Sequence, residues 1–332
     1  MNMNKQRRNF LTASGYALGS TLGLNSLSIK AQSYPDKPVK IIMPFAAGNT
    51  LDVSLRQVGE LFTKSTGQPL IIENKPGGAG FIAAVACAQA APDGYTLLLG
   101  NTSMLTINPH TFSKLPYDPV KSFRPVTNFL GATMVFAANV GVPANTLQEW
   151  IAYVKANPKK TNFASFTAGN SSHFAGVLLN KHAGLDMVHV PFNGTPPAVQ
   201  NLVGGQVQTA FLPLMAVKAQ VEAGKVKVFA VTSEKRSPLM PNIPTFLELG
   251  VPDLNIYIWS SLMAPAATPD AIVSKLNTEF TNALKTKEIQ DKWRMVDFEP
   301  LPTTPEESAN YIQADSKRWA EAVRISGFKA QD

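Results

Sequence analysis

The sequence predicts an α/β fold made of two lobes, and three observations support this prediction. Apolar runs typical of strands alternate with helix-like segments over residues 39–99, a rhythm that favours parallel strands joined by right-handed crossovers. A second unit with the same alternation covers residues 134–232. The chain has 332 residues, more than one hydrophobic core usually accommodates, so two lobes are expected.

The first unit is expected to contain three strands and two helices. The strands are VKIIMPF (39–45), PLIIEN (69–74) and YTLLLG (95–100), and the helices cover residues 51–67 and 80–91. Each strand is a nearly continuous apolar run, as expected for parallel strands covered on both faces. The single cysteine, Cys87, lies in the second helix among alanines. It has no partner for an intrachain disulfide and is predicted to be buried.

The second unit is expected to begin with the strand MVFAANV (134–140) and the helix TLQEWIAYVKANP (146–158). Thr146 and Glu149 fit a capping box at the start of that helix. The elements that follow are strands at 161–166, 187–192, 207–214 and 226–232, with helices at 172–182 and 196–205. This order again indicates strands that alternate with covering helices.

The remaining chain is expected to return to the first lobe. An extended segment, LNIYIWSSLMAPA (254–266), precedes two helices with Thr268 and Thr304 as N-caps, each followed by proline. Lobe one is therefore predicted to comprise residues 32–130 plus 256–332, and lobe two residues 131–255. The chain would cross between the lobes twice and form a hinge beside a cleft. In open α/β sheets, ligands bind outside the carboxyl ends of the strands.

The amino terminus is predicted to be an export signal. Residues 1–31 have a basic start, a modestly apolar middle and a small-residue end, the layout of a cleaved secretory signal. Within it, RRNFL (7–11) resembles the core of a twin-arginine signal. Cleavage near Ala31 would leave a mature chain that begins near Gln32, outside the cytoplasm. The alternative is a retained amphipathic anchor. No apolar run of membrane-spanning length follows Ala31, so the mature chain is predicted to be soluble.

The charge distribution does not favour nucleic acid as a partner. The formal net charge is +7, but residues 1–31 hold four bases and no acid, which leaves only +3 on the rest of the chain. No basic run with interleaved aromatic residues occurs elsewhere, so nucleic-acid binding is not expected.

Four turns rich in small and hydroxyl residues are candidates for ligand binding. They are PFAAGNTLD (44–52), GNTSM (100–104), TAGNSSHFAG (167–176) and FNGTPPA (192–198), and each follows a predicted strand. The start of a helix offers free backbone N–H groups, which can bind an anion without lysine or arginine. Each turn alone could be a simple connection between elements. Their recurrence after successive strands favours a cleft site for a carboxylate.

A nucleotide-dependent enzyme is the competing interpretation. Gly78, Gly80 and Ala83 fit the dinucleotide pattern G-x-G-x-x-G/A. However, the acidic residue expected about twenty positions later is absent, because the chain there reads LLLGNTSML. The four histidines lack metal-ligand spacing, and GNSSH fails the nucleophile-elbow pattern because His173 occupies its final glycine position. The sequence therefore predicts no catalytic residues, no metal and no cofactor.

Several motifs together resemble a known family. In order they are YPDKPVKIIMPFAAGNTLD, IIENKPGGAG, APDGYTLLLG, LPYDPVKSFRPV, SSHFAG, MVHVPFNGTPPA, LVGGQVQ and VTSEKRSP followed by PNIPTFLELGVP. This set resembles the substrate-binding receptors of tripartite tricarboxylate transporters, the Bug family of periplasmic receptors. The resemblance implies a type II-like periplasmic binding protein fold, with a hinge of two crossovers and an interlobe cleft. It further implies a monomer in the periplasm, which captures a small carboxylate and delivers it to the membrane permease of the transporter. A receptor that presents its ligand to a membrane sensor is the related alternative.

The resemblance also implies which residues contact the ligand. Matched residue by residue, they are Phe45, Ala46, Gly48, Asn49, Asp52, Asn101, Thr102, Ser103, Gly169, Ser171, Ser172, His173, Phe192, Asn193 and Gly194. Asn49 replaces a second glycine of the family, so an amide side chain is expected in the site. Trp259 is expected either to cap the ligand or to pack in the hinge.

One departure from the family pattern bears on specificity. Many members carry an aspartate after the strand that corresponds to VQTAF, whereas this chain has Leu212 and Pro213 there. The loss of that acid removes a partner for an ammonium group, and Leu212, Leu214 and Met215 would offer apolar surface. The predicted ligand is therefore a mono- or dicarboxylate with a substantial apolar or aromatic part, in preference to an amino acid.

Overall fold

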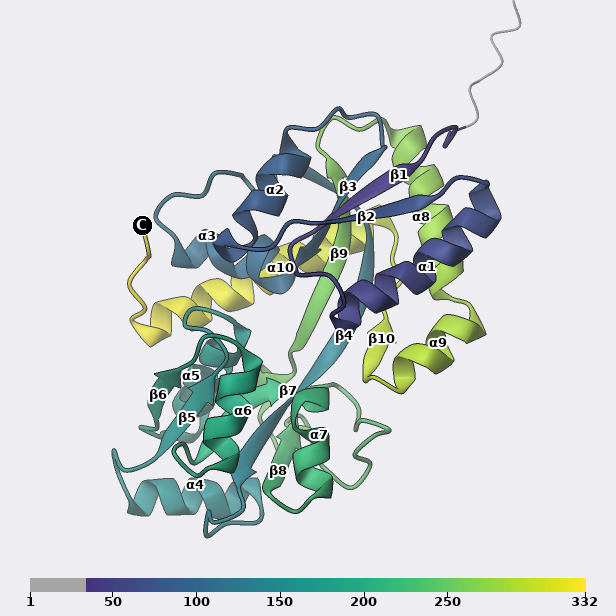
Figure 1. Cartoon of the computed structure of the whole chain (residues 1–332). Helices are drawn as coiled ribbons and strands as arrows, with labels where there is room; N and C mark the ends of the chain where they lie inside the picture. Colours follow the sequence, from purple (N-terminus) through teal and green to yellow (C-terminus); the bar gives the residue numbers. More distant parts are fainter. Residues whose placement is uncertain (1–33) are drawn as a thin grey trace, which may run out of the picture. The chain divides into compact units, whose positions relative to one another are not determined.

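A mixed sheet of ten strands runs through the part of the chain that the computed structural model describes, Tyr34–Asp332 (Figure 1). The predicted export signal lies outside these residues. Along the main path, the strand order is β2 (Leu70–Asn74), β1 (Val39–Met43), β3 (Thr96–Asn101), β9 (Tyr257–Pro265), β4 (Phe123–Asn139), β7 (Thr209–Pro213), β5 (Asn162–Ser165) and β6 (Val188–Pro191). Two further strands, β8 (Val226–Val231) and β10 (Phe298–Pro300), pair with β4. As predicted, β1 lies parallel to both β2 and β3.

Strand β4 carries the chain from one lobe to the other. Its first part, from Phe123 to Thr133, pairs antiparallel with β9, and its second part, from Met134 to Asn139, pairs with β7 and β8. The chain returns where the Ile256 N–H donates to the Thr232 carbonyl, and β9 then begins. These two crossings form the expected hinge. The precise lobe boundaries, 32–130 plus 256–332 and 131–255, stay predictions. We refer below to the β1 side as lobe one and to the β7 side as lobe two.

Ten α-helices cover the described sheet. In lobe one they are α1 (Thr50–Thr66), α2 (Phe81–Ala88), α3 (Asn108–Thr111), α8 (Asp270–Leu284), α9 (Lys287–Arg294) and α10 (Pro305–Ser326). In lobe two they are α4 (Leu147–Ala156), α5 (Ser171–Ala183), α6 (Thr195–Val203) and α7 (Leu214–Glu222). Short helical turns are η1 (Gly78–Gly80), η2 (Ser103–Ile107) and η3 (Pro252–Leu254), of which η2 is a π-helix.

Several elements were missed or misplaced by the sequence analysis. The strand predicted at 134–140 is only the lobe-two part of β4, since polar residues and Pro125 break the apolar pattern of the first part. Helix α7 was missed because its apolar start merges with the preceding strand. Helix α9 was missed because only Ile289 and Trp293 of its eight residues are buried. The segment of η2 and α3 was also not assigned.

The predicted helix caps are confirmed in part. Thr304 and Glu307 form the full capping box at the start of α10. Thr146 accepts a hydrogen bond from the Glu149 N–H as predicted, but the Glu149 carboxylate accepts from the Asn145 N–H rather than from Thr146. The prediction for Thr268 was wrong: Pro269 holds the N-cap position of α8, and the buried Thr268 hydroxyl has no hydrogen bond to any described residue.

Helix α10 packs against both lobes. It contacts η2 and β4 in lobe one and α5 in lobe two. Trp319, Ala322 and Val323 of α10 belong to the same apolar cluster as Phe174 of lobe two. Cys87 is fully buried in lobe one as predicted, and burial raises the pKa of its thiol to about 12. Among the described residues, no helix combines the length and apolarity needed to span a membrane.

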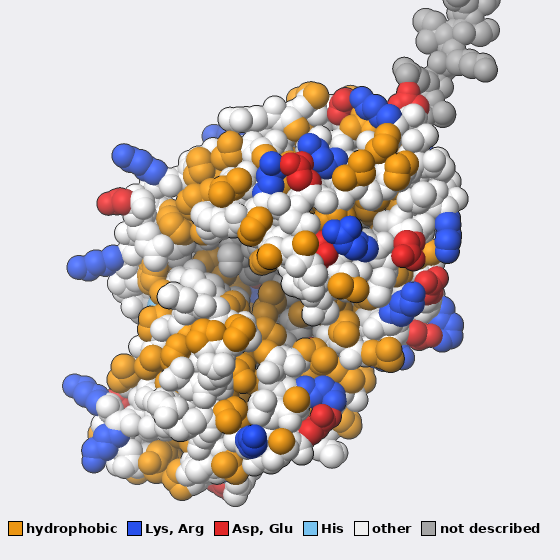
Figure 2. Space-filling model, viewed as in Figure 1, with side chains coloured by type: hydrophobic (Ala, Val, Ile, Leu, Met, Phe, Trp, Pro, Cys, Tyr) orange, Lys and Arg blue, Asp and Glu red, His pale blue; other side chains and the backbone are white. Residues whose placement is uncertain are grey.

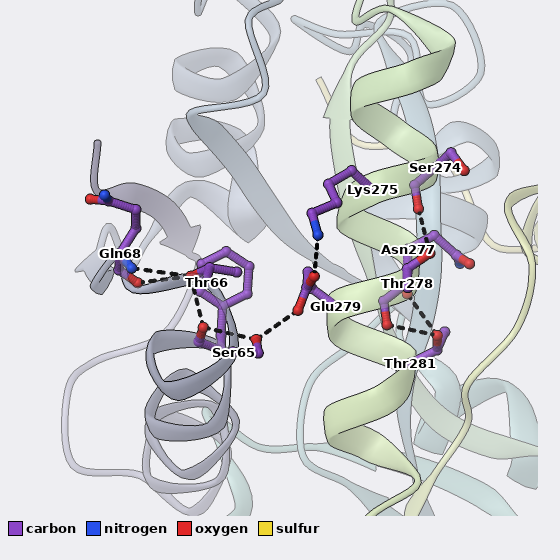
Figure 3. A network of polar contacts seen from close by, with 10 residues as sticks. Ser65, Thr66, Gln68, Ser274, Lys275, Asn277, Thr278, Glu279 and Thr281 are labelled. Carbon is purple, nitrogen blue, oxygen red and sulfur yellow. Dashed lines mark hydrogen bonds and ion pairs between the residues drawn. The ribbon is translucent and has the colours of Figure 1, made fainter. Parts of the chain in front are cut away.

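A polar network joins α1 to α8 in lobe one (Figure 3). The Ser65 hydroxyl donates to Glu279 Oε2 over 2.6 Å, and Lys275 Nζ donates to Glu279 Oε1 over 2.6 Å. Glu279 is 9% exposed. Burial alone would raise its pKa, but the hydrogen bonds from Lys275 and Ser65 outweigh burial and lower it.

We expect the Glu279→Gln variant to lose about 1–2 kcal/mol of unfolding free energy at pH 7. Because the pKa of Glu279 is lowered in the folded protein, its stabilising contribution is present above the unfolded pKa and is lost as pH falls through the folded value. Urea unfolding of both proteins at neutral and acidic pH checks this. Their difference should shrink on acidification, while Glu60→Gln, an exposed change on α1, should have little effect. A difference that is independent of pH would contradict the assignment.

Candidate ligand-binding site

The predicted turns fall into two groups, one in each lobe. Parallel neighbours end at the same edge of a sheet. This places the turns after β1 and β3 together in lobe one. It likewise places the turns after β5, β6 and β7 together in lobe two. Figure 2 shows that the molecular surface is hollowed between the lobes. That both groups contact one ligand stays a prediction.

Asp52 organises the turn after β1. Its carboxylate is 2% exposed. Oδ2 accepts from the Gly48 N–H and from Arg56 Nε, both over 3.0 Å, and Oδ1 accepts from Asn74 Nδ2 over 3.1 Å. Burial raises its pKa, but these hydrogen bonds lower it overall. In this conformation, therefore, neither Asp52 nor the Gly48 N–H is free to bind a ligand.

The Asn49 side chain also serves the turn rather than entering the site. Its Oδ1 accepts from the Asp52 N–H over 2.9 Å, which makes it the N-cap of α1, and its Nδ2 donates to the Ala46 carbonyl over 2.7 Å. An amide side chain was expected in the site here, but both ends of this amide bond within the turn and cap the helix. Phe45 and Ala46 are among the exposed residues of the turn, and the Ala46 N–H has no partner among the described residues.

The turn after β3 is tied to the hinge strand. Thr102 is 2% exposed, and its hydroxyl accepts from the Trp259 N–H and donates to the Trp259 carbonyl. Asn101 Oδ1 accepts from the Met104 N–H. The half-buried Ser103 has a hydroxyl without a partner among the described residues. Thr102 is therefore a structural contact, whereas Ser103 and the Asn101 amide group remain candidates for the ligand.

Trp259 packs in the hinge, which was one of the two expected alternatives. It is 1% exposed, and its indole N–H donates to Asp315 Oδ2 over 2.9 Å. The same oxygen accepts from the Trp319 indole over 2.9 Å and from the Thr106 hydroxyl over 3.0 Å. Asp315 thus joins β9, η2 and α10 in the core. Burial raises the pKa of Asp315 despite these hydrogen bonds.

Asn170 organises the turn after β5, and the sequence analysis missed it. Its Oδ1 accepts from the Ser172 N–H, the His173 N–H and the Ser172 hydroxyl. Ser172 is fully buried, and its oxygen also accepts from the Phe166 N–H. The hydroxyl of Ser172 therefore builds the turn. That of Ser171, a residue only 3% exposed, has no partner among the described residues. Asparagine directly before a predicted helix was the available signal for this cap.

His173 stabilises the same turn through a hydrogen bond to its backbone. Its Nδ1 accepts from the Gly169 N–H over 3.2 Å, which places the ring proton of a neutral histidine on Nε2. The ring stacks on His189 with centroids 3.7 Å apart and planes at 9°. Burial lowers the pKa of His173 to about 4. Burial and the neighbouring His173 lower the pKa of His189 to about 3. Both rings are therefore neutral at pH 7.

The last two turns of lobe two offer fewer polar groups than expected. Asn193 is exposed, but Phe192 packs on the lobe-two core and the Gly194 N–H donates to the Phe166 carbonyl. Leu212 is fully buried and Pro213 is half-buried at the end of β7. The expectation that Leu212 and Leu214 offer surface to a ligand was wrong, because both belong to the core. Met215 is 40% exposed and remains available.

Two cavities lie elsewhere in the described molecule. One of about 450 Å³ lies behind the hinge, between residues 233–238 and 297–302. The other, of about 1080 Å³, lies in lobe one between residues 109–125 and α10. Neither includes the predicted turns. Over residues 34–332, no group of three or more histidine, cysteine or acidic side chains could hold a metal ion.

Two α/β lobes joined by paired strands, with neutral hydrogen-bond donors in the turns, define a two-lobed solute-binding protein. Residues 54–328 match the model of the tripartite tricarboxylate transporter family receptor. The chain belongs to this family.

Solved structures agree with the assignment. The periplasmic binding protein BugD is 32% identical, with a TM-score of 0.74 over 90% of this chain and 100% of BugD. MatC of Rhodopseudomonas palustris, solved with bound malate, is 33% identical, with a TM-score of 0.72 over 87% and 100% of the two chains. R. palustris Rpa4515, solved with adipate, is 28% identical, with a TM-score of 0.78 over 90% and 100%. The predicted family and the periplasmic-binding-protein fold class are confirmed.

Proposed function

We propose that this chain is an extracytoplasmic receptor that captures a small carboxylate between its lobes and delivers it to the permease subunits of a tripartite tricarboxylate transporter. The observation that carries the proposal is a set of neutral donors, at strand ends in both lobes, that have no partner within residues 34–332. These donors are the Ala46 N–H and the hydroxyls of Ser103 and Ser171. Such donors hydrogen-bond a carboxylate without a permanent cation. The ligands of MatC and Rpa4515, malate and adipate, support the class.

The apolar groups at the turns favour a ligand with an apolar section. Phe45 is 36% exposed on the lobe-one turn, and Met215 is 40% exposed at the start of α7 in lobe two. The aspartate that many family members place near Pro213 is absent, so an ammonium group would lack a partner there. We infer a preference for a carboxylate such as adipate, with its methylene chain, over aspartate or glutamate.

The cellular setting belongs to the same proposal. Family membership supports a periplasmic receptor, and the basic, twin-arginine-like start of the sequence supports export with cleavage near Ala31. The receptor would act as a monomer, with lobe closure favoured by ligand contacts to both lobes.

A thermal-shift screen of the chain from Gln32 onward tests the proposed function. The panel comprises malate, adipate, benzoate, aspartate, glutamate and a nicotinamide nucleotide. A ligand at about 100 times its dissociation constant adds about 2.7 kcal/mol of stability, which raises the Tm by several degrees. Stabilisation by adipate or benzoate supports the proposal. Stabilisation by the acidic amino acids alone refutes the inferred specificity, and stabilisation by the nucleotide alone refutes the receptor.

Ser171→Ala and Ser172→Ala form a matched pair of variants. We expect Ser171→Ala to weaken binding of the stabilising carboxylate by about 1–3 kcal/mol, because its free hydroxyl would lose a hydrogen bond to a charged group. Ser172→Ala should instead lower the Tm, since the Ser172 hydroxyl bonds within the turn. Isothermal titration and thermal unfolding of both variants separate the two roles. Unchanged affinity in Ser171→Ala would remove this hydroxyl from the site.

A further inference from the structure

The segment after α10, residues 327–332, contacts both lobes. We call it the C-terminal segment. Its far end is fixed on lobe one, where the Gln331 N–H donates to the Thr111 carbonyl over 2.8 Å and the Gln331 carbonyl accepts from the Ser113 N–H over 2.8 Å. These bonds form a parallel bridge between Gln331 and Phe112. Figure 1 shows this segment leaving the end of α10 and running toward α3.

The near end of the C-terminal segment lies against lobe two. The Phe328 ring meets His173 and Phe174 edge-on, with centroids 5.8 Å apart in each case and planes at 61° and 77°. Phe328 is held in place by its own N–H, which donates to the Ser326 hydroxyl over 3.0 Å. The ring therefore packs directly against the start of α5.

Phe328 also constrains the turn before α5. A Cβ at Gly169 would lie 2.9 Å from Phe328 Cζ, and Gly169 has a φ of +74°. The left-handed backbone favours glycine at this position, and a Cβ here would also force the Phe328 ring to shift. Since the Gly169 N–H donates to His173 Nδ1, the ring of Phe328 contacts both partners of a hydrogen bond that shapes the turn.

We propose that Phe328 is a positioning residue for ligand binding, and that the C-terminal segment ties the lobe-two binding turn to lobe one. The proposal rests on the proposed function for the role of Ser171, the free hydroxyl in this turn. Phe328 supports the side of the turn formed by Gly169 and His173. The bridge between Gln331 and Phe112 attaches the C-terminal segment, and with it Phe328, to lobe one. The two strand crossings of the hinge and the packing of α10 on both lobes are therefore supplemented by a further connection, made of side-chain packing and one short bridge.

Hydrogen–deuterium exchange on four variants tests the proposal in the ligand-free protein. Phe328→Ala removes the ring, Phe328→Tyr keeps it, and a chain shortened after Phe328 keeps the ring but loses the lobe-one bridge. Met295→Ala, an exposed apolar change in lobe one, is the matched control. We expect Phe328→Ala to speed exchange of amides 166–176 by roughly two- to thirtyfold, the range for mutations along coupled networks. The shortened chain should speed exchange at both 109–113 and 166–176. Phe328→Tyr and the control should match the parent protein.

Titration with adipate and malate then measures binding separately. If the parent protein binds one of these acids, we expect Phe328→Ala to bind that acid roughly two- to thirtyfold more weakly. Phe328→Tyr should have the affinity of the parent protein. Unchanged exchange of amides 166–176 in Phe328→Ala overturns the positioning role. If Phe328→Ala speeds exchange of amides 166–176 but the shortened chain does not, the proposed link between this turn and lobe one is wrong. If the parent protein binds neither acid and benzoate does not stabilise it either, the proposed ligand class fails, whereas the exchange data still decide the role of Phe328.

Discussion

Replacement of Gly176 by alanine is expected to destabilise lobe two by about 3 kcal/mol, the upper part of the usual range for overpacking a core. Gly176 lies in α5 where the helix packs on β5. A Cβ there would lie 2.0 Å from Phe163 Cε2 and 2.4 Å from Phe163 Cδ2. The Phe163 ring is 1% exposed and stacks on His189, so it has no free space into which to move.

Urea unfolding measures this loss, and two further variants identify its cause. Gly184→Ala adds a methyl group where no atom lies within 4 Å but φ is +62°. It should therefore cost only the backbone strain, about 1 kcal/mol. Adding Phe163→Leu to Gly176→Ala should recover part of the loss, because the two positions are in contact and their effects are not additive. A loss for Gly176→Ala no larger than that for Gly184→Ala would refute the packing argument.

Asp315→Ala is expected to cost roughly 3–5 kcal/mol, because it leaves two buried indole N–H groups without an acceptor. They belong to Trp259 and Trp319, which are 1% and 0% exposed. Asp315→Asn keeps an acceptor oxygen and should lose much less. Thermal unfolding at pH 7 compares the two variants. Equal losses would show that the volume of the side chain, rather than its acceptor, stabilises this part of the core.

The same carboxyl predicts a pH dependence. The two indoles and the Thr106 hydroxyl all bond to Oδ2. Arg318 Nη1 lies 3.8 Å from Oδ1, beyond hydrogen-bond distance, which leaves Oδ1 able to carry a proton. Burial raises the folded pKa above the unfolded one. The protonated Asp315 carboxyl therefore contributes its whole stabilisation at pH values below its pKa in the unfolded chain. This contribution is lost as pH rises through its pKa in the folded protein. The parent protein should therefore gain stability relative to Asp315→Asn as pH falls through this window.

Local patterns predicted most of the fold. The alternation over residues 39–99 was correct because β1 and β3 are apolar runs, and the amphipathic α1 between them is bounded by the local caps Asn49 and Gly67. The N-cap Thr304 was correct because a threonine followed by proline at the start of a helix is a local signal. Elements with weak local signals, such as α9, were not predicted. The length of β4 depends on its pairing with β9, which is remote in sequence.

The site was predicted at the level of turns but not of side chains. Thr102 and Ser172 both lie in the expected turns, yet their hydroxyls bond to Trp259 and Asn170. A turn sequence does not specify whether a hydroxyl bonds within the protein or remains free, because that depends on partners such as Trp259 that are distant along the chain. The resemblance to the family indicated which turns form the site. Within these turns, the hydroxyls of Ser103 and Ser171 have no partner among the described residues, which makes them the candidates for ligand contact.

The place of β9 in the sheet constrains the order in which the protein can fold. Strand β9 lies between β3 and β4 in lobe one, yet it follows the whole of lobe two in sequence. During synthesis, the sheet of β1, β2 and β3 cannot be completed until lobe two and then β9 have been synthesised. Such long-range pairing slows folding and leaves the edge of β3 open to other chains in the interval. A protein with this topology is therefore expected to benefit from a chaperone during synthesis.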